Sequence, residues 1–192
     1  MVTCLSLGTH THSPPPLPRP SSLAIMTPLN QGGLQSGGRL LLNAGDTWTA
    51  SAPIAIRGWG SGGSNEGPAA TVGAYSTEPI ATQQRPWIRR TAAAGVWPVL
   101  SLTNCAGLEI TGLEISGGEQ GVLFSYDAPR SPAWGGLVVS DCYIHGIRGT
   151  RPASGSALWW ATGVGFNTTG RTDVVASNIV IVNNIFNDSD VA

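Results

Sequence analysis

The residues between about 148 and 162 carry the side chains that most resemble a binding site. They include two basic and two aromatic residues, namely Arg148, Arg151, Trp159 and Trp160. Aromatic faces stack on sugar rings, and a guanidinium group can hold a carboxylate through two hydrogen bonds. This combination predicts a binding site for a sugar or a sugar acid. The alternative is that one Trp ring is buried beneath a loop and that the other ring shields it.

A second group of polar residues alternates with apolar residues in short segments. The side chains that this alternation places on the outside are Glu109, Glu114, Tyr143 and His145. Asp141 falls at a corner, and Asp188 and Asp190 fall one repeat later. Carboxylates on neighbouring turns can share a cation such as Ca²⁺. The competing interpretation, which the pattern favours, is that the Glu residues keep a solvated face polar and that Asp141 only shapes a corner.

The elements that position these residues repeat along the chain. Three segments align without gaps and have apolar residues two positions apart: residues 107–118, 136–147 and 178–189. A period of two is that of a β-strand, in which alternate side chains point to opposite faces. A shorter GVxF segment, at 121–124 and again at 163–166, precedes the next long segment by 15 residues in both cases. The equal spacing predicts strands that recur in a fixed order, with 13 extra residues inserted between about 148 and 162.

Parallel stacking of these repeats explains the pattern better than an antiparallel sandwich. Each strand would pair with the equivalent strand one turn away, about 4.8 Å along the axis. The inward residues Leu108, Leu137 and Ile179 would then lie above one another. Asp141 and Asn183 would share a corner position, where their residue types tolerate left-handed backbone. No Asn-Gly dipeptide, a strong signal of an antiparallel hairpin, occurs in the sequence. We therefore expect an all-β parallel β-helix, or solenoid.

Composition fits one such domain. The chain has 192 residues, of which 41% are hydrophobic and 11% charged, and its 26 Gly and 14 Pro argue against a helical bundle. All ten basic residues are Arg and are scattered, so nothing resembles the clustered basic face that binds nucleic acid. Three Cys are too few for a disulfide framework, and Cys142 is expected to be a small buried residue. No stretch is long and apolar enough to predict a membrane span.

The two ends of the chain differ from its middle. Residues 1–20 are Pro-rich and lack the features of a signal peptide, so we expect them to be disordered. Residues 21–192 are expected to form the N-terminal turns of the solenoid. The chain stops directly after a repeat and shows no polar capping segment, which predicts truncation at the C-terminus.

The early part of the chain resembles the opening of the pectate-lyase-like right-handed parallel β-helix proteins. The resemblance rests on residues 22–24 (SLA), 33–42 (GLQSGGRLLL), 44–48 (AGDTW), 53–56 (PIAI), 70–75 (ATVGAY) and 85–88 (RPWI). It implies a right-handed coil with a short N-terminal capping helix. The sequence departs from the family pattern at Ser36, at Gly38 and at Pro28, which falls inside the expected cap helix and would break or shorten it.

The resemblance also implies an extracellular protein that acts on or binds polysaccharide, as a lyase or a glycosidase-like hydrolase. Lyase chemistry on a uronate needs a base and a cation, and because Lys is absent the base would be Arg, His or Tyr. Hydrolysis needs paired carboxylates, and no matching motif set is present, so no catalytic residue is assigned. The predicted substrate-binding residues are Trp159, Trp160, Arg148, Arg151, Tyr143 and His145. The predicted cation ligands are Asp141, Asp188 and Asp190, with Ca²⁺ as the ion.

Two other interpretations remain open at the level of sequence. One is a non-catalytic β-helix module for glycan binding or surface adhesion, and the other is a truncated gene product without function. Polysaccharide is the expected partner and a monomer the expected state. Two glycosylation triplets, at Asn167 and Asn187, weakly favour an extracellular setting.

Overall fold

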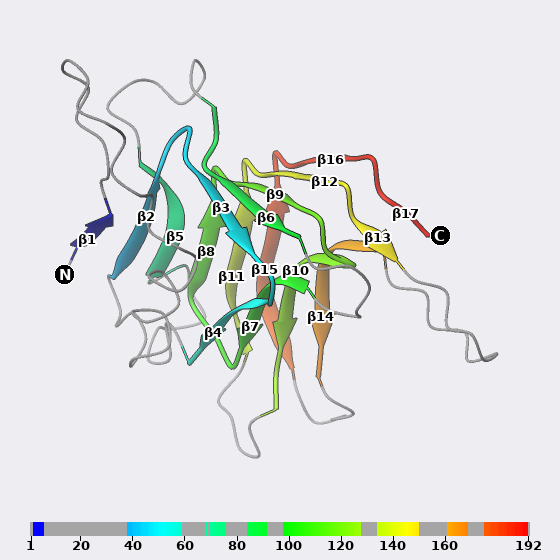
Figure 1. The fold of residues 1–192 in the computed structure, drawn as a ribbon. Helices are drawn as coiled ribbons and strands as arrows, with labels where there is room; N and C mark the ends of the chain where they lie inside the picture. Colours follow the sequence, from blue (N-terminus) through cyan, green and yellow to red (C-terminus); the bar gives the residue numbers. More distant parts are fainter. Residues whose placement is uncertain are drawn as a thin grey trace.

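A computed structural model gives the fold (Figure 1). It describes residues 2–5, 38–58, 68, 70–75, 84–91, 98–127, 134–149, 161–168 and 175–191. Every regular element within these ranges is a β-strand, and every strand pairing is parallel. The residues expected to form a capping helix lie outside the described ranges. No helix in the described part of the chain is long and apolar enough to cross a membrane.

The strands form three main sheets, here called A, B and C, and a small sheet D. Sheet A contains β1 (Val2–Leu5), β2 (Arg39–Asn43), β5 (Ala70–Tyr75), β8 (Leu108–Thr111), β11 (Trp134–Ser140) and β15 (Ala176–Val182). Sheet B contains β3 (Thr47–Ala50), β6 (Trp87–Arg90), β9 (Glu114–Ser116), β12 (Tyr143–His145) and β16 (Ile185–Asn187). Sheet C contains β4 (Ile54–Arg57), β7 (Pro98–Thr103), β10 (Gln120–Ser125) and β14 (Thr162–Asn167). Sheet D pairs β13 (Arg148–Gly149) with β17 (Asp190–Val191).

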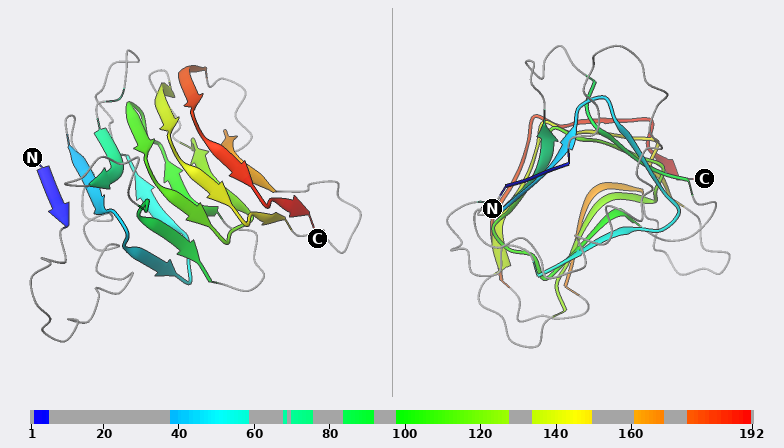
Figure 2. Two further views of the ribbon diagram at one scale, coloured as in Figure 1. Left: turned by 90° about the horizontal axis from the view of Figure 1, so that it is seen from above. Right: turned by 60° about the vertical axis from the view of Figure 1, so that its left-hand side comes forward.

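From β2 onward the chain visits sheets A, B and C in that order and then returns to sheet A. Each inner strand of a sheet therefore pairs with its equivalent from the pass before and the pass after, whereas a strand at the end of a sheet has one such partner. Figure 2 shows this arrangement from two sides: strands of successive passes lie side by side in one view and overlie one another in the other. This order continues after the 13 extra residues of the sequence, because β14 pairs with β10 in sheet C.

The register of pairing agrees with the alignment of the repeats. In sheet B, Ile144 pairs with Ile115 on one side and with Phe186 on the other. In sheet C, the two GVxF segments pair residue for residue, Val122 with Val164 and Phe124 with Phe166. The Phe rings stack with centroids 5.2 Å apart. The equal 15-residue spacing in the sequence thus correctly predicted which strands are neighbours.

Apolar side chains from all three sheets meet in one core. The aligned residues Leu108, Ile115 and Ile144 are fully buried, and Leu137 is nearly so. Cys142 is also fully buried, as expected, and burial raises the pKa of its thiol from 9.0 to about 11. Alternation along each strand sends these residues inward and leaves the residues between them on an outer face.

Corners between sheets A and B share a left-handed backbone. The φ angle is 83° at Gly45, 67° at Gly112, 53° at Asp141 and 57° at Asn183. These residues come at the same place in four passes of the chain. Gly adopts this geometry without strain, and Asn and Asp tolerate it better than other residues do. The predicted role of Asp141 and Asn183 as corner residues is confirmed.

The last pass is more exposed than its sequence pattern predicts. Phe186 pairs with the buried Ile144, yet it is 50% exposed, and Ile181 and Ile185 are 46% and 54% exposed. β15 and β16 are the terminal strands of sheets A and B, so their side chains have a stacked neighbour on one side only. A pattern of apolar residues identifies the inward positions, but burial also requires a strand on each side.

The first residues also differ from expectation. Within the segment expected to be disordered, Val2–Leu5 forms β1 and pairs in parallel with β2. The other residues of 1–20 lie outside the described ranges. A short run without Gly or Pro can add to an open sheet edge, because such an edge offers unpaired N–H and C=O groups.

Candidate functional site

The outer surface of sheet B carries a group of polar and aromatic side chains that hydrogen-bond and stack with one another. We call it the sheet B face, and it consists of Trp87, Arg89, Glu114, Ser116, Tyr143, His145 and Asn187. The pairing register arranges these residues in two columns that run across the strands. Trp87, Glu114 and Tyr143 form one column, and Arg89, Ser116, His145 and Asn187 form the other.

The inward residues fix this outward orientation. Ile88, Ile115 and Ile144 lie between the two columns on β6, β9 and β12, and all three are buried. Because side chains alternate along a strand, burying these isoleucines directs both columns outward. The sheet B face is therefore attached to the rigid core rather than to a loop.

His145 and Glu114 interact diagonally across two neighbouring strands. His145 Nε2 donates to Glu114 Oε1 at 2.9 Å, and the two side chains are only 21% and 25% exposed. A carboxylate on one ring nitrogen fixes the orientation of an imidazole. In the neutral ring, this bond leaves Nδ1 as the nitrogen that can accept a proton or a hydrogen bond.

A continuous series of stacking contacts joins the strands of the face. The Tyr143 and His145 rings have centroids 4.3 Å apart and are inclined by 17°. The His145 and Trp87 rings are 6.2 Å apart, and the Arg89 guanidinium carbon lies 5.4 Å from the Trp87 centroid. Since stacked faces cover one another, the groups best placed to meet a ligand are the polar edges: the phenol, the imidazole and the guanidinium.

Hydrogen bonds hold the two aromatic residues at the ends of this series. Trp87 Nε1 donates to Ser116 Oγ at 2.8 Å, and Asn187 Nδ2 donates to the Tyr143 hydroxyl at a longer 3.5 Å. Each bond connects one strand to the next. The side chains are thus largely oriented before any ligand arrives, which lowers the entropy cost of binding.

Tyr143 and His145, both predicted site residues, are brought together with Glu114, one of the residues predicted to lie outside. Arg148 lies away from them, in sheet D, where its guanidinium forms an exposed ion pair with Asp188 at 3.5 Å. More than half of each of these two side chains is exposed, so this pair contributes little stability. Arg151, Trp159 and Trp160 lie outside the described residues.

The three predicted cation ligands do not gather at one site, and each has a different environment. Asp141 forms a corner, and its backbone carbonyl accepts a hydrogen bond from Arg85 Nε at 3.0 Å. Asp188 pairs with Arg148, and Asp190 lies beside Arg148 in the register of sheet D. Among the described residues, no three His, Cys, Asp or Glu side chains gather in a way that could hold a metal ion.

Four residues of the face were not predicted: Trp87, Arg89, Ser116 and Asn187. Trp87 and Arg89 pair with Glu114 and Ser116, so they belong to the preceding pass of the chain. Residues 76–83, between β5 and β6, lengthen that pass and hide the spacing that would have aligned it with the later repeats. Aligning Trp87-Ile88-Arg89 with Glu114-Ile115-Ser116 would have found both residues.

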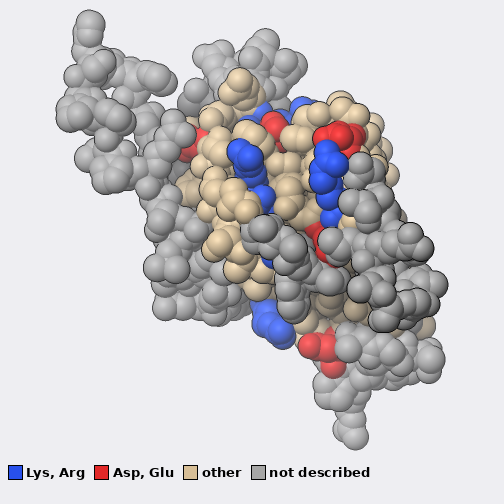
Figure 3. All heavy atoms as spheres, turned by 45° about the vertical axis from the view of Figure 1, so that its right-hand side comes forward, with Lys and Arg blue, Asp and Glu red and all other residues tan. Residues whose placement is uncertain are grey.

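Glu109, the other predicted outward acid, lies on sheet A, where its carboxylate accepts a hydrogen bond from Thr71 at 3.3 Å. Two exposed Arg side chains of the described residues lie close to acids, Arg57 to Asp127 and Arg148 to Asp188. Figure 3 shows one side of the molecule, where some blue and red groups touch and tan atoms lie between others. The described residues form no extended basic surface on that side.

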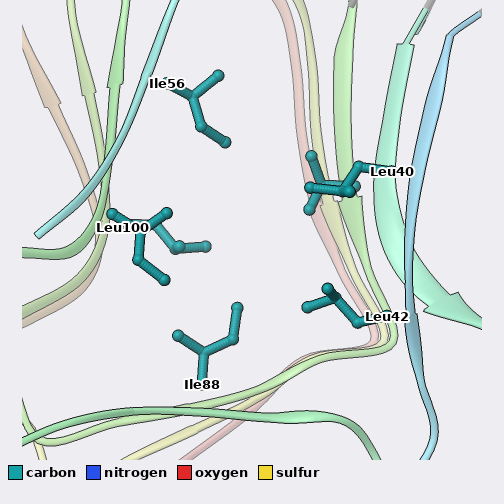
Figure 4. Close-up of a pocket in the computed structure, with 7 residues that line it drawn as sticks. Leu40, Leu42, Ile56, Ile88 and Leu100 are labelled. Carbon is teal, nitrogen blue, oxygen red and sulfur yellow. The ribbon is translucent and has the colours of Figure 1, made fainter. Parts of the chain in front are cut away.

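The interior cavity is too small and too apolar to be a ligand site. It has a volume of about 10 Å³ and is lined by Leu40, Leu42, Ile54, Ile56, Val72, Ile88 and Leu100 (Figure 4). A volume of this size holds one water at most, and an apolar lining gives a water no hydrogen-bond partner. This cavity therefore carries no candidate chemistry.

Comparisons with known proteins give one weak structural similarity. No protein-family model matches the sequence, and no curated protein matches it. The fold is similar to the crystal structure of alginate lyase from Paenibacillus sp. str. FPU-7, with a TM-score of 0.40 and 14% sequence identity. The alignment covers 86% of this chain and 64% of that chain, so the chain spans less than two thirds of the structure that it matches.

Proposed function

We propose that this chain is a right-handed parallel β-helix that works outside the cell and binds polysaccharide on the sheet B face. The fixed order of sheets A, B and C, with parallel pairing between passes, supports a coil of this kind. The observation that carries the functional proposal is the series Arg89, Trp87, His145, Tyr143. It presents ordered polar edges on β6 and β12, the strands on either side of β9 in sheet B.

A polysaccharide suits this face for physical reasons. Sugars present many hydroxyl groups that both donate and accept hydrogen bonds, and the face offers a phenol, an imidazole, an amide and a guanidinium. A small compact ligand would be expected to need a concave pocket, whereas an extended chain can bind along an open sheet surface.

The binding test uses titration calorimetry with a panel of soluble acidic and neutral polysaccharides. Trp87→Ala and His145→Ala should each weaken binding about tenfold, which corresponds to about 1.4 kcal/mol. Glu109→Ala is the matched control, because it removes an outward polar side chain from sheet A. Far-UV circular dichroism verifies that each variant is folded. The proposal fails if no polysaccharide binds, or if the control loses as much affinity as the two sheet B variants.

Catalysis is a second candidate function, favoured by the contact between His145 and Glu114. An imidazole oriented by a carboxylate can accept a proton from a bound substrate. Absorbance of unsaturated products would report lyase activity, and new reducing ends without that absorbance would report hydrolysis. Glu114→Gln should then reduce the rate while leaving affinity nearly unchanged. Binding without turnover would identify a non-catalytic module.

A further inference from the structure

The strands of the last pass expose apolar side chains at one end of the molecule. β14, β15 and β16 are terminal strands of sheets C, A and B, and β4, β1 and β3 are the terminal strands on the opposite side. Figure 2 shows β15 and β16, in red, at the end of the row of strands that lies away from β1, in blue. All exposed large hydrophobic residues in the described ranges lie between residues 166 and 186. We call the surface formed by β14, β15 and β16 the β15 end.

β15 carries apolar residues on both of its faces. Ile181 lies in register with the inward, buried Val139. Val182 is an outward residue, and it lies in register with Ser140 and Thr111 of the two preceding strands, which are polar. Ile181 and Val182 are nevertheless 46% and 42% exposed. A strand that is apolar on both faces is typical of a strand that is covered on both sides.

The β15 end also offers backbone edges. A terminal strand presents N–H and C=O groups that can pair with a further strand. Exposed apolar patches on the order of several hundred Å² mark interaction sites, and half-exposed Phe, Val and Ile side chains on three strands supply an area of that order. With the strand edges between them, this surface approaches the roughly 800 Å² that each partner buries in a stable interface.

The chemistry of this surface indicates which partner covers it. Neither β14 nor residues 175–187 contain a charged residue, so two copies of the surface can meet without repulsion between like charges. An occupant that covers all three edges must present three strand edges in the same arrangement. A second copy of this chain does so, whereas one extended peptide would cover a single edge.

The opposite end of a second copy does not suit this contact. There β1 already pairs with β2, and inward residues of the first pass such as Leu42, Trp48 and Ile56 are at most 5% exposed. The second copy would therefore contribute its own β15 end. Contact between identical surfaces has a two-fold axis and closes at two copies. A two-fold axis across the row of strands reverses their direction, so the joined edges run antiparallel.

We infer that two copies of this chain associate through their β15 ends as a two-fold dimer, in which β15 pairs antiparallel with β15 of the second copy. The dimer covers Ile181 and Phe186 and continues sheet A from one copy into the other. This state differs from the monomer expected from the sequence. It does not depend on polysaccharide binding, so either proposal can fail without the other.

Analytical ultracentrifugation of the full chain over a concentration series tests the dimer. The wild type should sediment as a dimer at micromolar concentration. Ile181→Glu introduces one charge from each copy into the contact and should raise the dissociation constant at least tenfold. Ile185→Glu makes the same change on β16 at a residue outside the core cluster, so it decides the result if Ile181→Glu fails to fold. Far-UV circular dichroism verifies the fold of each variant.

Thr49→Glu is the matched control. Thr49 is exposed on β3, the terminal strand of sheet B at the opposite end, so its replacement should leave association unchanged. A wild type that stays monomeric throughout the series would overturn the inference, as would folded Glu variants of the β15 end that dimerise as the wild type does. Growth beyond two copies, or an equal loss of association in Thr49→Glu, would indicate head-to-tail contact and overturn the two-fold arrangement.

Discussion

Replacing Gly121 by Ala tests the stacking of the passes at a single atom. Gly121 lies in β10 opposite Gly163 of β14, because its neighbours Gln120 and Val122 pair with Thr162 and Val164. A Cβ at Gly121 would lie 2.6 Å from the Gly163 carbonyl oxygen and 2.7 Å from Ile144 Cγ2. Both distances are shorter than real Cβ atoms tolerate.

Neither neighbour can move freely. The carbonyl belongs to the backbone of a paired strand, and Ile144 is fully buried. Added volume in a packed interior costs about 1–3 kcal/mol. We therefore expect Gly121→Ala to lower the free energy of unfolding by about 2 kcal/mol, in urea titrations followed by tryptophan fluorescence.

Gly165→Ala is the matched control in the neighbouring strand. Its Cβ would meet Leu123 Cδ1 at 3.4 Å and Thr162 Cγ2 at 3.6 Å, which are ordinary contacts. The lower chain entropy of Ala in the unfolded state should then leave stability unchanged or raised by up to about 1 kcal/mol. The register of β10 with β14 would be refuted if both variants lost the same free energy of unfolding. It would also be refuted if Gly121→Ala were as stable as the wild type.

Three further predictions concern the core and one corner. Ile144→Ala should lower the free energy of unfolding by about 2–5 kcal/mol in the same urea assay, because it opens a cavity in the core; a loss below about 1 kcal/mol would contradict this. Asn184→Ala should cost about 1–3 kcal/mol, since its amide donates to the Val139 carbonyl and accepts from the Cys142 N–H, and both groups would lose a partner; thermal unfolding measures it. The Cys142 thiol has a pKa of about 11 in the folded protein and 9.0 in the unfolded chain. Between pH 9 and pH 11 the unfolded thiol therefore loses its proton while the folded one keeps it. The free energy of unfolding should fall by about 2–3 kcal/mol across this range. Cys142→Ala should lack this part of the pH dependence, and an unchanged slope would show that the thiol is not protected.

Much of the fold could be predicted from the sequence because equivalent strands recur in a fixed order and pair in parallel with one another. The register of β10 with β14, and the corners at Asp141 and Asn183, follow from constant spacing and from residue types that suit a left-handed turn. The repeat spacing did not identify the strand that contains Trp87, because extra residues lengthen that pass of the chain. Exposure of Phe186 could not be predicted from its own repeat, since it depends on whether another strand lies beyond β16.

The candidate site was predicted less completely than the fold. Alternation correctly placed Tyr143 and His145 on an outer face, because side-chain direction follows directly from strand period. Alternation along one strand says nothing about diagonal contacts between strands. The hydrogen bond from His145 to Glu114 and the stacking of His145 with Trp87 depend on side-chain conformation, so only the structure revealed them.

Hydroxyl-radical footprinting with mass spectrometry tests the proposed binding face most directly. The protein is oxidised alone and with saturating polygalacturonate, and oxidation is quantified for each residue. Trp87, Tyr143 and His145 should be protected together, whereas Phe166, which is 38% exposed on sheet C, should not change. Protection of Phe166 with unchanged oxidation of the three sheet B residues would place the ligand elsewhere and contradict the account.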